Sequence, residues 1–281
     1  HLVYCSVTGF GQTGPYAPRA GYDFLAQGIG GIMSITGAPE GEPVKVGVGI
    51  ADVMTGMYAS TAILAALRHR DATGEGQHID TCLLDTQISW LINEGTNYLI
   101  SGKIPKRLGN EHPNIVPYKV FSTSDGYVIL AVGNDRQFRD WCTAAGADDL
   151  KDDKRFKTNP LRIKNREVLY QKMPSFMKRR TTKEWLSIME EVKVPCSPVN
   201  NIEQVFDDPH VKHREMKIEM DHELSGSGKV PLIGNPLKLS ATPPQYRRPP
   251  PTLGQHTEEV LSEILELNSQ EIKELRDKGA I

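Results

Sequence analysis

The stretch that decides the fold is "GVGIADVMTGMYASTAILAALRHR", Gly47 to Arg70, in which a single acid precedes a long apolar segment. Apolar residues recur at helical spacing from Val53 to Leu67. Basic residues follow them, at the end of a helix where the macrodipole favours positive charge. The pattern therefore predicts a long helix from Asp52 to about Arg70, with Asp52 at its N-terminus.

Two roles are open to Asp52. Aspartate is among the best helix N-caps, because its side-chain oxygen accepts a hydrogen bond from a backbone N–H that has no partner within the helix. The same position also suits an ionised, accessible carboxylate, since Gly47, Gly49 and Gly56 leave little side-chain bulk around it. Such a carboxylate can act as a covalent nucleophile toward an activated acyl group. The residue pattern favours the cap and leaves the nucleophile open.

The segments around this helix have the character of an α/β layer. "LVYCSV", Leu2 to Val7, is rich in β-branched and aromatic residues and predicts a buried strand. The run Gly21–Ile35 has helical spacing with interior glycines, which favour close packing against another backbone. Thr73–Leu84 predicts a turn followed by a strand, and a long helix is expected from Asp85 to Ser101.

Glycine and proline interrupt the helical pattern at Gly102–Pro117, and we place the first domain boundary there, between residues 103 and 104. Beyond it, Tyr118–Gly133 predicts two strands around an Asp-Gly turn. Helices are expected at Asp135–Ala145 and Asn165–Val192, the second interrupted near Pro174.

The C-terminal part begins with a proline-rich connector, Ala241–Thr257, and a last amphipathic helix is expected from Thr257 to about Arg276. The predicted fold class is α/β. A first domain is expected in residues 1–103, an α+β domain in 104–235, and the connector with the last helix in 236–281; the return of this last segment to the large domain is implied only by the family resemblance given below.

Composition narrows the class of protein. The chain has 281 residues, 38% hydrophobic and 24% charged, as expected for a globular protein. A net charge of -2 gives no general reason to expect nucleic acid or an acidic membrane as a partner. No apolar run approaches the ~20 residues of a membrane span. The four cysteines are widely spaced without a CxxC pair, so we expect neither a metal site nor a disulfide framework.

The motif "GFGQTG", Gly9 to Gly14, satisfies GxGxxG directly after the first predicted strand. A dinucleotide site needs a helix that emerges from the loop and an acid ~20 residues further on. Here Pro15 and Pro18 follow the glycines, and the nearest acid, Asp23, comes too soon. We therefore do not expect a nicotinamide or flavin cofactor in this loop.

Two longer stretches carry a family resemblance: "YCSVTGFGQTGPYAPRAGYDFLAQGIGGIMSITG" and "GIADVMTGMYASTAILAALRHRDATGEGQHID". They resemble the class III (CaiB/BaiF-type) CoA-transferases. "GNEHPNIVPYKVFSTSDGYVILAVGNDRQF" and "RPPPTLGQHTEEVL" resemble the second domain and the C-terminal return of that family. The motifs are collinear over the whole chain, and in detail they are most similar to the mitochondrial branch that transfers CoA from succinyl-CoA to dicarboxylates such as glutarate.

The resemblance implies an architecture and a location. It implies a Rossmann-like large domain, a smaller α+β domain and an interlocked homodimer. His1 stands where Met is expected, and we expect the family's N-terminal portion to be missing from this sequence. Mitochondrial residence is implied by the resemblance alone, with the cytoplasm as the other expectation.

The resemblance also implies a chemistry. In this family the aspartate of the "AD" pair before the long helix is the nucleophile, and Asp52 occupies that position. The implied course passes through a mixed anhydride on Asp52 and then an aspartyl-CoA thioester. The expected partners are acyl-CoA and small carboxylic acids, with CoA as a substrate and no separate cofactor or metal.

Four further residues have roles implied by the resemblance. Tyr22 stands in "GYD" where related racemases carry a histidine, and it is expected to line the thioester end of CoA unless it is a core aromatic. Arg19 falls where the family places basic residues near CoA phosphates. His112 and Asn114 lie in a loop that some members build as a glycine run, and they are expected either to donate to an acyl carboxylate or oxyanion, or to cap a turn.

Two other functions stay open at this point. An acyl-CoA racemase would need an acid/base pair at the α-carbon, and the phenol of Tyr22, with an ordinary pKa near 10, is a poor base at neutral pH. The other alternative is a non-catalytic acyl-CoA-binding protein.

Overall fold

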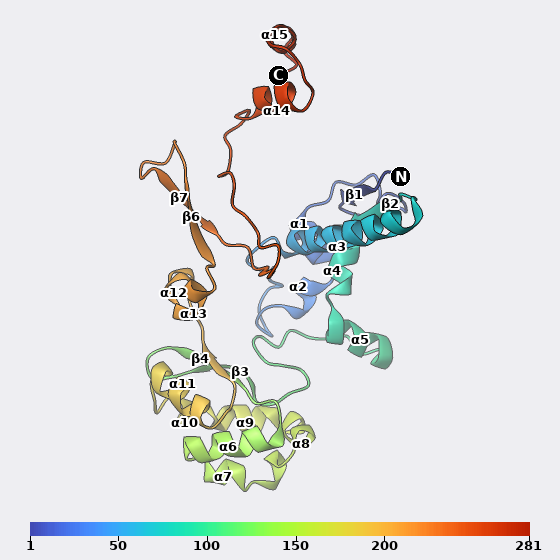
Figure 1. Cartoon of the computed structure of the whole chain (residues 1–281). Helices are drawn as coiled ribbons and strands as arrows, with labels where there is room; N and C mark the ends of the chain where they lie inside the picture. Colours follow the sequence, from blue (N-terminus) through green and yellow to red (C-terminus); the bar gives the residue numbers. More distant parts are fainter. The chain divides into compact units, whose positions relative to one another are not determined.

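The computed structural model describes residues 1–281 (Figure 1) and divides into two compact units, His1–Val199 and Asn200–Ile281. The predicted domain boundaries at 103/104 and 235/236 stay predictions. The first half of unit 1 contains, in chain order, β1 (Tyr4–Thr8), α1 (Asp23–Ile29), α2 (Ile32–Ile35), α3 (Ile50–Thr73), β2 (His78–Cys82), α4 (Leu83–Ser89) and α5 (Ile92–Ser101).

Strands β1 and β2 form a two-stranded parallel sheet, with Tyr4 paired to His78 and Thr8 to Cys82. Helix α3 packs against both strands and against α1 and α4, as Figure 1 shows. The prediction of a strand at Leu2–Val7 is confirmed, but the prediction that this strand is buried is wrong. The side chains of Tyr4 and Val7 remain more than half exposed, and β2 is the one strand that pairs with β1.

Glycines set the closest backbone contact in this region. A Cβ atom added to Gly21, before α1, would lie 2.3 Å from the Cα of Gly9, after β1. The two segments therefore touch backbone to backbone, which only glycine permits. The helix predicted for Gly21–Ile35 is in fact two helices, because Gly31 adopts a left-handed conformation with φ of 87° between α1 and α2.

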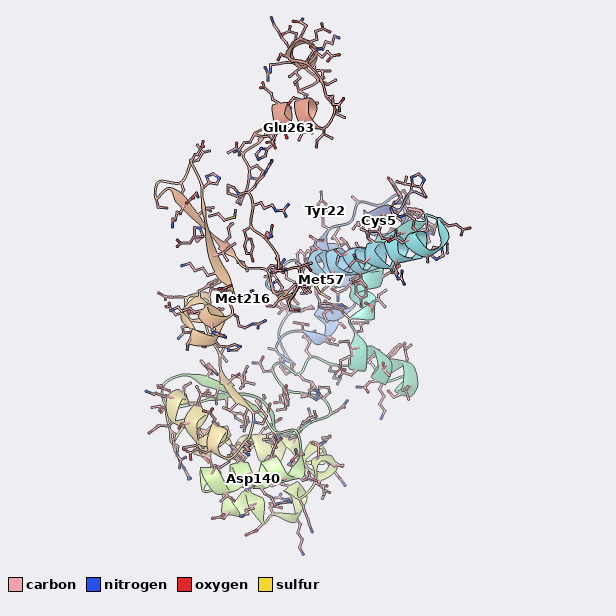
Figure 2. All side chains as sticks on the ribbon, in the orientation of Figure 1. Cys5, Tyr22, Met57, Asp140, Met216 and Glu263 are labelled. Carbon is pink, nitrogen blue, oxygen red and sulfur yellow. The ribbon has the colours of Figure 1, made fainter.

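Helix α3 is longer than predicted, and its buried face differs from the predicted one. It begins at Ile50 and ends at Thr73, where Gly74 adopts φ of 81° and closes the helix. Its buried face consists of small residues, Ala51, Thr55, Ala59 and Ala66. Three residues of the predicted apolar stripe lie outward: Val53, Met57 (labelled in Figure 2) and Leu64 are 55%, 58% and 68% exposed. The other two, Ile63 and Leu67, are partly buried. Small side chains allow the close approach of α1 and α4, so packing density rather than hydrophobicity selects the inner face.

By length and composition alone, α3 is also able to cross a membrane, which corrects the expectation that no segment is long and apolar enough. A single helix of this kind is weak support for a membrane protein, because core helices of soluble proteins meet the same criterion.

The helix predicted from Asp85 to Ser101 divides into α4 and α5. The break falls at Trp90 and Leu91, directly before Ile92, whose φ of 41° is a left-handed conformation that a β-branched residue rarely adopts. The continuous apolar pattern across the break gave no sign of it.

The second half of unit 1 holds a larger core around a three-stranded antiparallel sheet, in the order β3-β4-β5. The predicted hairpin at the Asp-Gly turn and the helix at Asp135–Ala145 are both confirmed. The elements are β3 (Tyr118–Ser122), β4 (Tyr127–Ala131), α6 (Asp135–Ala145), α7 (Asp148–Lys151), the 3-10 helix η1 (Lys154–Phe156), α8 (Asn159–Lys164), α9 (Arg166–Lys172), α10 (Pro174–Met177), α11 (Thr182–Glu191) and β5 (Cys196–Pro198).

A buried arginine ties this core to the segment before β3. Arg162 is fully buried, and its Nε and Nη1 atoms donate to the carbonyls of Val116 and Phe156 at 2.6 and 3.0 Å. Its Nη2 atom lies 2.9 Å from the carboxylate of Asp135. Burial lowers the pKa of Arg162 below its ordinary value, and the bond to Asp135 opposes that shift.

Unit 2 contains α12 (Ile202–Asp207), α13 (Pro209–His213), the antiparallel pair β6 (Lys217–Asp221) and β7 (Lys229–Ile233), α14 (Thr257–Glu263) and α15 (Ser269–Asp277). The single last helix expected from Thr257 to Arg276 is wrong. The chain turns at Glu266, with φ of 56°, and Asn268 starts a new helix through a capping box with Glu271.

All four cysteines are free thiols, and two of them are predicted to be unreactive in the folded chain. Burial raises the pKa of Cys142 to about 12 and that of Cys196 to about 11. Because the thiolate is the nucleophile, iodoacetamide at pH 8 should leave both unmodified in the native protein and label both in urea. Mass spectrometry of the cysteine peptides checks this, and native labelling of Cys142 would contradict it.

Candidate active site

Asp52 is the third residue of α3 and is exposed, and its carboxylate accepts no hydrogen bond from the chain. The N-cap position belongs to Gly49, which has no side chain to contribute. The interpretation of Asp52 as the helix cap is therefore wrong. The carboxylate is left available to a ligand.

The cap of α3 comes from another helix. Oδ1 of Asp23, the first residue of α1, accepts from the backbone N–H groups of Ala51 at 2.7 Å and of Asp52 at 3.4 Å. Its Oδ2 atom accepts from Nε2 of Gln27 at 2.7 Å, one turn further along α1. Gln27 is fully buried, and its Oε1 atom accepts from the N–H of Val46 at 2.9 Å. Asp23 thus supplies from a distance the capping interaction that Gly49 cannot make.

The two carboxylates border the same space beside Gly49. A Cβ atom at Gly49 would lie 3.7 Å from Cγ of Asp23 and 3.7 Å from Oδ2 of Asp52. The absence of a side chain there keeps the approach to Asp52 open. Both oxygens of Asp23 accept hydrogen bonds, whereas neither oxygen of Asp52 does. Of the two carboxylates, Asp52 is therefore the one free to react with a ligand.

Tyr22 immediately precedes Asp23 and so is carried to the start of α3. Its side chain is 72% exposed and projects from the ribbon before α1 (Figure 2), so the interpretation as a core aromatic is wrong. The backbone carbonyl of Tyr22 accepts from the N–H of Ala26 and begins α1. The structure therefore brings Tyr22 and Asp52 to the same end of α3 through the bonds of Asp23.

Arg19 lies in the turn that follows the glycine motif and is exposed. Its guanidinium carbon lies 3.8 Å from the centre of the Tyr16 ring, which in turn meets Phe10 edge-on at 5.7 Å between ring centres. Stacking holds the guanidinium while its donors remain open to a ligand.

The glycine motif itself is not arranged to bind phosphate. The N–H of Gly11 donates to Oγ1 of Thr8 at 2.9 Å, and that of Gln12 donates to Oδ2 of Asp80 at 3.0 Å. One of these two N–H groups thus bonds a carboxylate, and the charge of Asp80 opposes a phosphate there. The expectation that this segment binds no nicotinamide or flavin cofactor stays a prediction.

His112 and Asn114 form a local turn. Nδ1 of His112 accepts from the N–H of Asn114 at 3.0 Å, and the imidazole packs against Tyr118 at 5.3 Å between ring centres. This geometry agrees with the turn-capping alternative for His112. No hydrogen bond or ion pair in the structure joins either residue to Asp52.

The loop around that turn is bound to the core in the second half of unit 1. Asn159 donates to the carbonyl of Asn114 at 2.9 Å, and Arg166 donates to that of Pro113 at 2.6 Å. Lys119 forms an ion pair with Glu111 at 2.8 Å. The loop is therefore held at several points along its length.

The sequence interpretation missed Asp23 and Gln27. In the sequence, Asp23 was considered only as an acid that lies too close to the glycine motif to bind a ribose. The available signal was the i, i+4 spacing of Asp23 and Gln27 in "DFLAQ", a pair that meets on one helix face. The structure shows no group of three or more His, Cys, Asp or Glu side chains that could hold a metal ion.

Comparison with known proteins gives consistent matches over most of the chain. A curated succinate–glutarate CoA-transferase from Agrobacterium fabrum is 48% identical over 94% of this chain and 65% of its own length. The human succinyl-CoA:glutarate CoA-transferase is 41% identical over 100% of this chain and 64% of its own length. The chain thus spans about two thirds of the length of these relatives.

A solved structure of a CaiB/BaiF family protein from Brucella suis superposes with a TM-score of 0.80 at 46% identity, covering 93% of this chain and 68% of that one. This match confirms the predicted mixed α/β class. Residues 1–257 match the family described as CoA-transferase family III. Since that match covers most of the sequence and the relatives are collinear with it, the chain belongs to CoA-transferase family III.

Proposed function

We propose that the protein is a CoA-transferase that moves CoA from an acyl-CoA donor to a carboxylic acid, with Asp52 as the covalent nucleophile. The observation that carries the proposal is the exposed carboxylate of Asp52, free of hydrogen bonds at the start of α3, in a chain of this family. Because no hydrogen bond to this carboxylate has to break, it is available to attack an acyl carbon.

The proposed course balances without any further reagent. The Asp52 carboxylate attacks the carbonyl carbon of the donor thioester, and CoA leaves as the thiolate, which gives a mixed anhydride. The thiolate then attacks the Asp52 carbonyl carbon, the donor acid leaves as its carboxylate, and an aspartyl-CoA thioester remains. The acceptor carboxylate then attacks the carbonyl carbon of aspartyl-CoA and expels the thiolate, which gives a second anhydride. The thiolate attacks the acceptor's carbonyl carbon in that anhydride, which forms the new acyl-CoA and releases Asp52 as its carboxylate. One thioester replaces another, so the site has only to position and stabilise the groups.

We propose succinyl-CoA as the donor and glutarate or a similar dicarboxylate as the acceptor. The names of the Agrobacterium and human relatives, at 48% and 41% identity, support this choice. CoA is here a substrate, and the scheme uses no metal or separate cofactor. For the assembled protein we propose a Rossmann-like large domain, an interlocked homodimer, and residence in mitochondria or in the cytoplasm.

We propose roles for four more residues. Tyr22 lines the thioester end of CoA, which its exposure beside Asp23 supports. Arg19 binds a CoA phosphate through its open guanidinium, since planar N–H donors suit phosphate oxygens. His112 and Asn114 donate to the distal carboxylate or the oxyanion of the acyl group.

The test is an exchange assay on the intact protein with unlabelled succinyl-CoA and radiolabelled glutarate. Label entering the CoA thioester pool is the expected result. Binding of CoA without any labelled thioester would overturn the proposal in favour of a binding protein. Rapid exchange of the substrate α-proton with deuterated solvent, without transfer, would overturn it in favour of a racemase.

A further inference from the structure

We propose that Asp23 is a positioning residue for Asp52: its carboxylate fixes the first turn of α3, and Gln27 fixes that carboxylate. This inference rests on the proposed function, because it gives Asp23 a purpose only if Asp52 must be placed accurately against an acyl carbon.

The first step is the direct bond between the two residues. Oδ1 of Asp23 accepts from the N–H of Asp52 itself and, at 2.7 Å, from that of Ala51. The other N–H groups of the turn are satisfied locally: Ile50 donates to Val48 and Val53 to Gly49. Asp23 therefore holds the two donors nearest the reacting side chain, and no other group in the chain accepts a hydrogen bond from them.

The second step is the support behind Asp23. Gln27 is fully buried, and both ends of its amide are bonded, Nε2 to Asp23 and Oε1 to the N–H of Val46. A buried amide with both ends engaged has one orientation. The bonds connect the segment before α3, helix α1 and the first turn of α3, so the three move together.

The third step is the difference in hydrogen bonding between the carboxylates of Asp23 and Asp52. Both oxygens of Asp23 accept hydrogen bonds, whereas the side chain of Asp52 accepts none. Attack by Asp23 on an acyl group would leave buried donors unpaired, which is costly. Asp23 therefore acts through Asp52, and its position beside Tyr22 also sets the distance between Tyr22 and the nucleophile.

The test measures the rate at which Asp52 is acylated in the intact protein at saturating succinyl-CoA, by rapid quench and mass spectrometry of the Asp52 peptide, together with CoA affinity by calorimetry. Asp23→Ala removes both bonds to α3 and should slow acylation roughly 10- to 100-fold, the range expected when a reacting group shifts by about 1 Å. CoA affinity should be unchanged. Asp23→Asn keeps an oxygen facing Ala51 but turns its amide nitrogen toward Nε2 of Gln27, so it should give an intermediate rate.

The matched control is Asn134→Ala, which removes a helix cap of the same kind at α6, where Asn134 accepts from the N–H of Gln137. It should lower the melting temperature about as much as Asp23→Ala while acylation stays at the native rate. Gln27→Met has a similar volume and leaves Asp23 in place, but it removes the hydrogen bond from Gln27 to Asp23. Its acylation rate should lie between those of the native protein and Asp23→Ala. This variant tests the proposal even if Asp23→Ala does not fold.

The outcomes are distinct. Native acylation in Asp23→Ala or in Gln27→Met would overturn the positioning role, as would an equal slowing by Asn134→Ala, which would indicate general destabilisation. Absence of acylation in the unmutated protein would instead overturn the proposed function.

Discussion

Asp52→Asn is expected to lower transfer of CoA by at least about 1,000-fold and to abolish the covalent adduct on the Asp52 peptide. An amide lacks the anionic oxygen that attacks the thioester. Because the Asp52 side chain is exposed and accepts no hydrogen bond, the change should leave the melting temperature where it was. Steady-state transfer to labelled glutarate and mass spectrometry of the quenched protein provide the two measurements.

The control for this prediction is Asp71→Asn, which removes an exposed acid at the other end of α3. It changes net charge by the same amount and should keep native activity. An acyl adduct on the Asp52 peptide of the Asn variant, or activity within tenfold of native as a working limit (~1.4 kcal/mol), would contradict Asp52 as the nucleophile.

Gly21→Ala is expected to destabilise the fold by about 2–4 kcal/mol and to reduce activity with it. The added Cβ would lie 2.3 Å from the Cα of Gly9, a contact between two backbones that no rotamer change relieves. Relief requires the segment before α1 to move, and that segment carries Tyr22 and Asp23. Urea denaturation followed by circular dichroism measures the free energy of unfolding.

Gly9→Ala tests the same contact from the other side and should show a similar loss, since its Cβ would lie 2.5 Å from the Cα of Gly21. Gly226→Ala is the matched control, because a Cβ there meets nothing within 4 Å and its φ is not left-handed. A loss in Gly21→Ala no larger than that in Gly226→Ala would show that the two segments are not in contact.

Local patterns predicted the local structure well. The Asp-Gly pair located the β3–β4 hairpin, and the helix expected at Asp135–Ala145 is α6, because turn chemistry and helical spacing act over a few residues. The family resemblance, which the comparisons confirm, singled out Asp52 before any coordinates.

The predictions that failed depend on contacts between residues that are distant in sequence. Asp52 looked like the cap of its own helix, but the cap is Asp23, separated from Ala51 by a loop and reached only after α1 packs on α3. The inner face of α3 was also misjudged, because close helix contacts select small residues such as Ala51 and Thr55 over the larger apolar ones. Neither effect follows from periodicity.

The open surroundings of Asp52 impose a kinetic competition on the proposed chemistry. An aspartyl-CoA thioester formed on an exposed carboxylate is within reach of solvent, and its hydrolysis would release CoA and restore Asp52 with no transfer to an acceptor. The ratio of transfer to this thioesterase-like side reaction would then rise with the concentration of acceptor acid, so the supply of dicarboxylate would determine how much acyl-CoA is wasted.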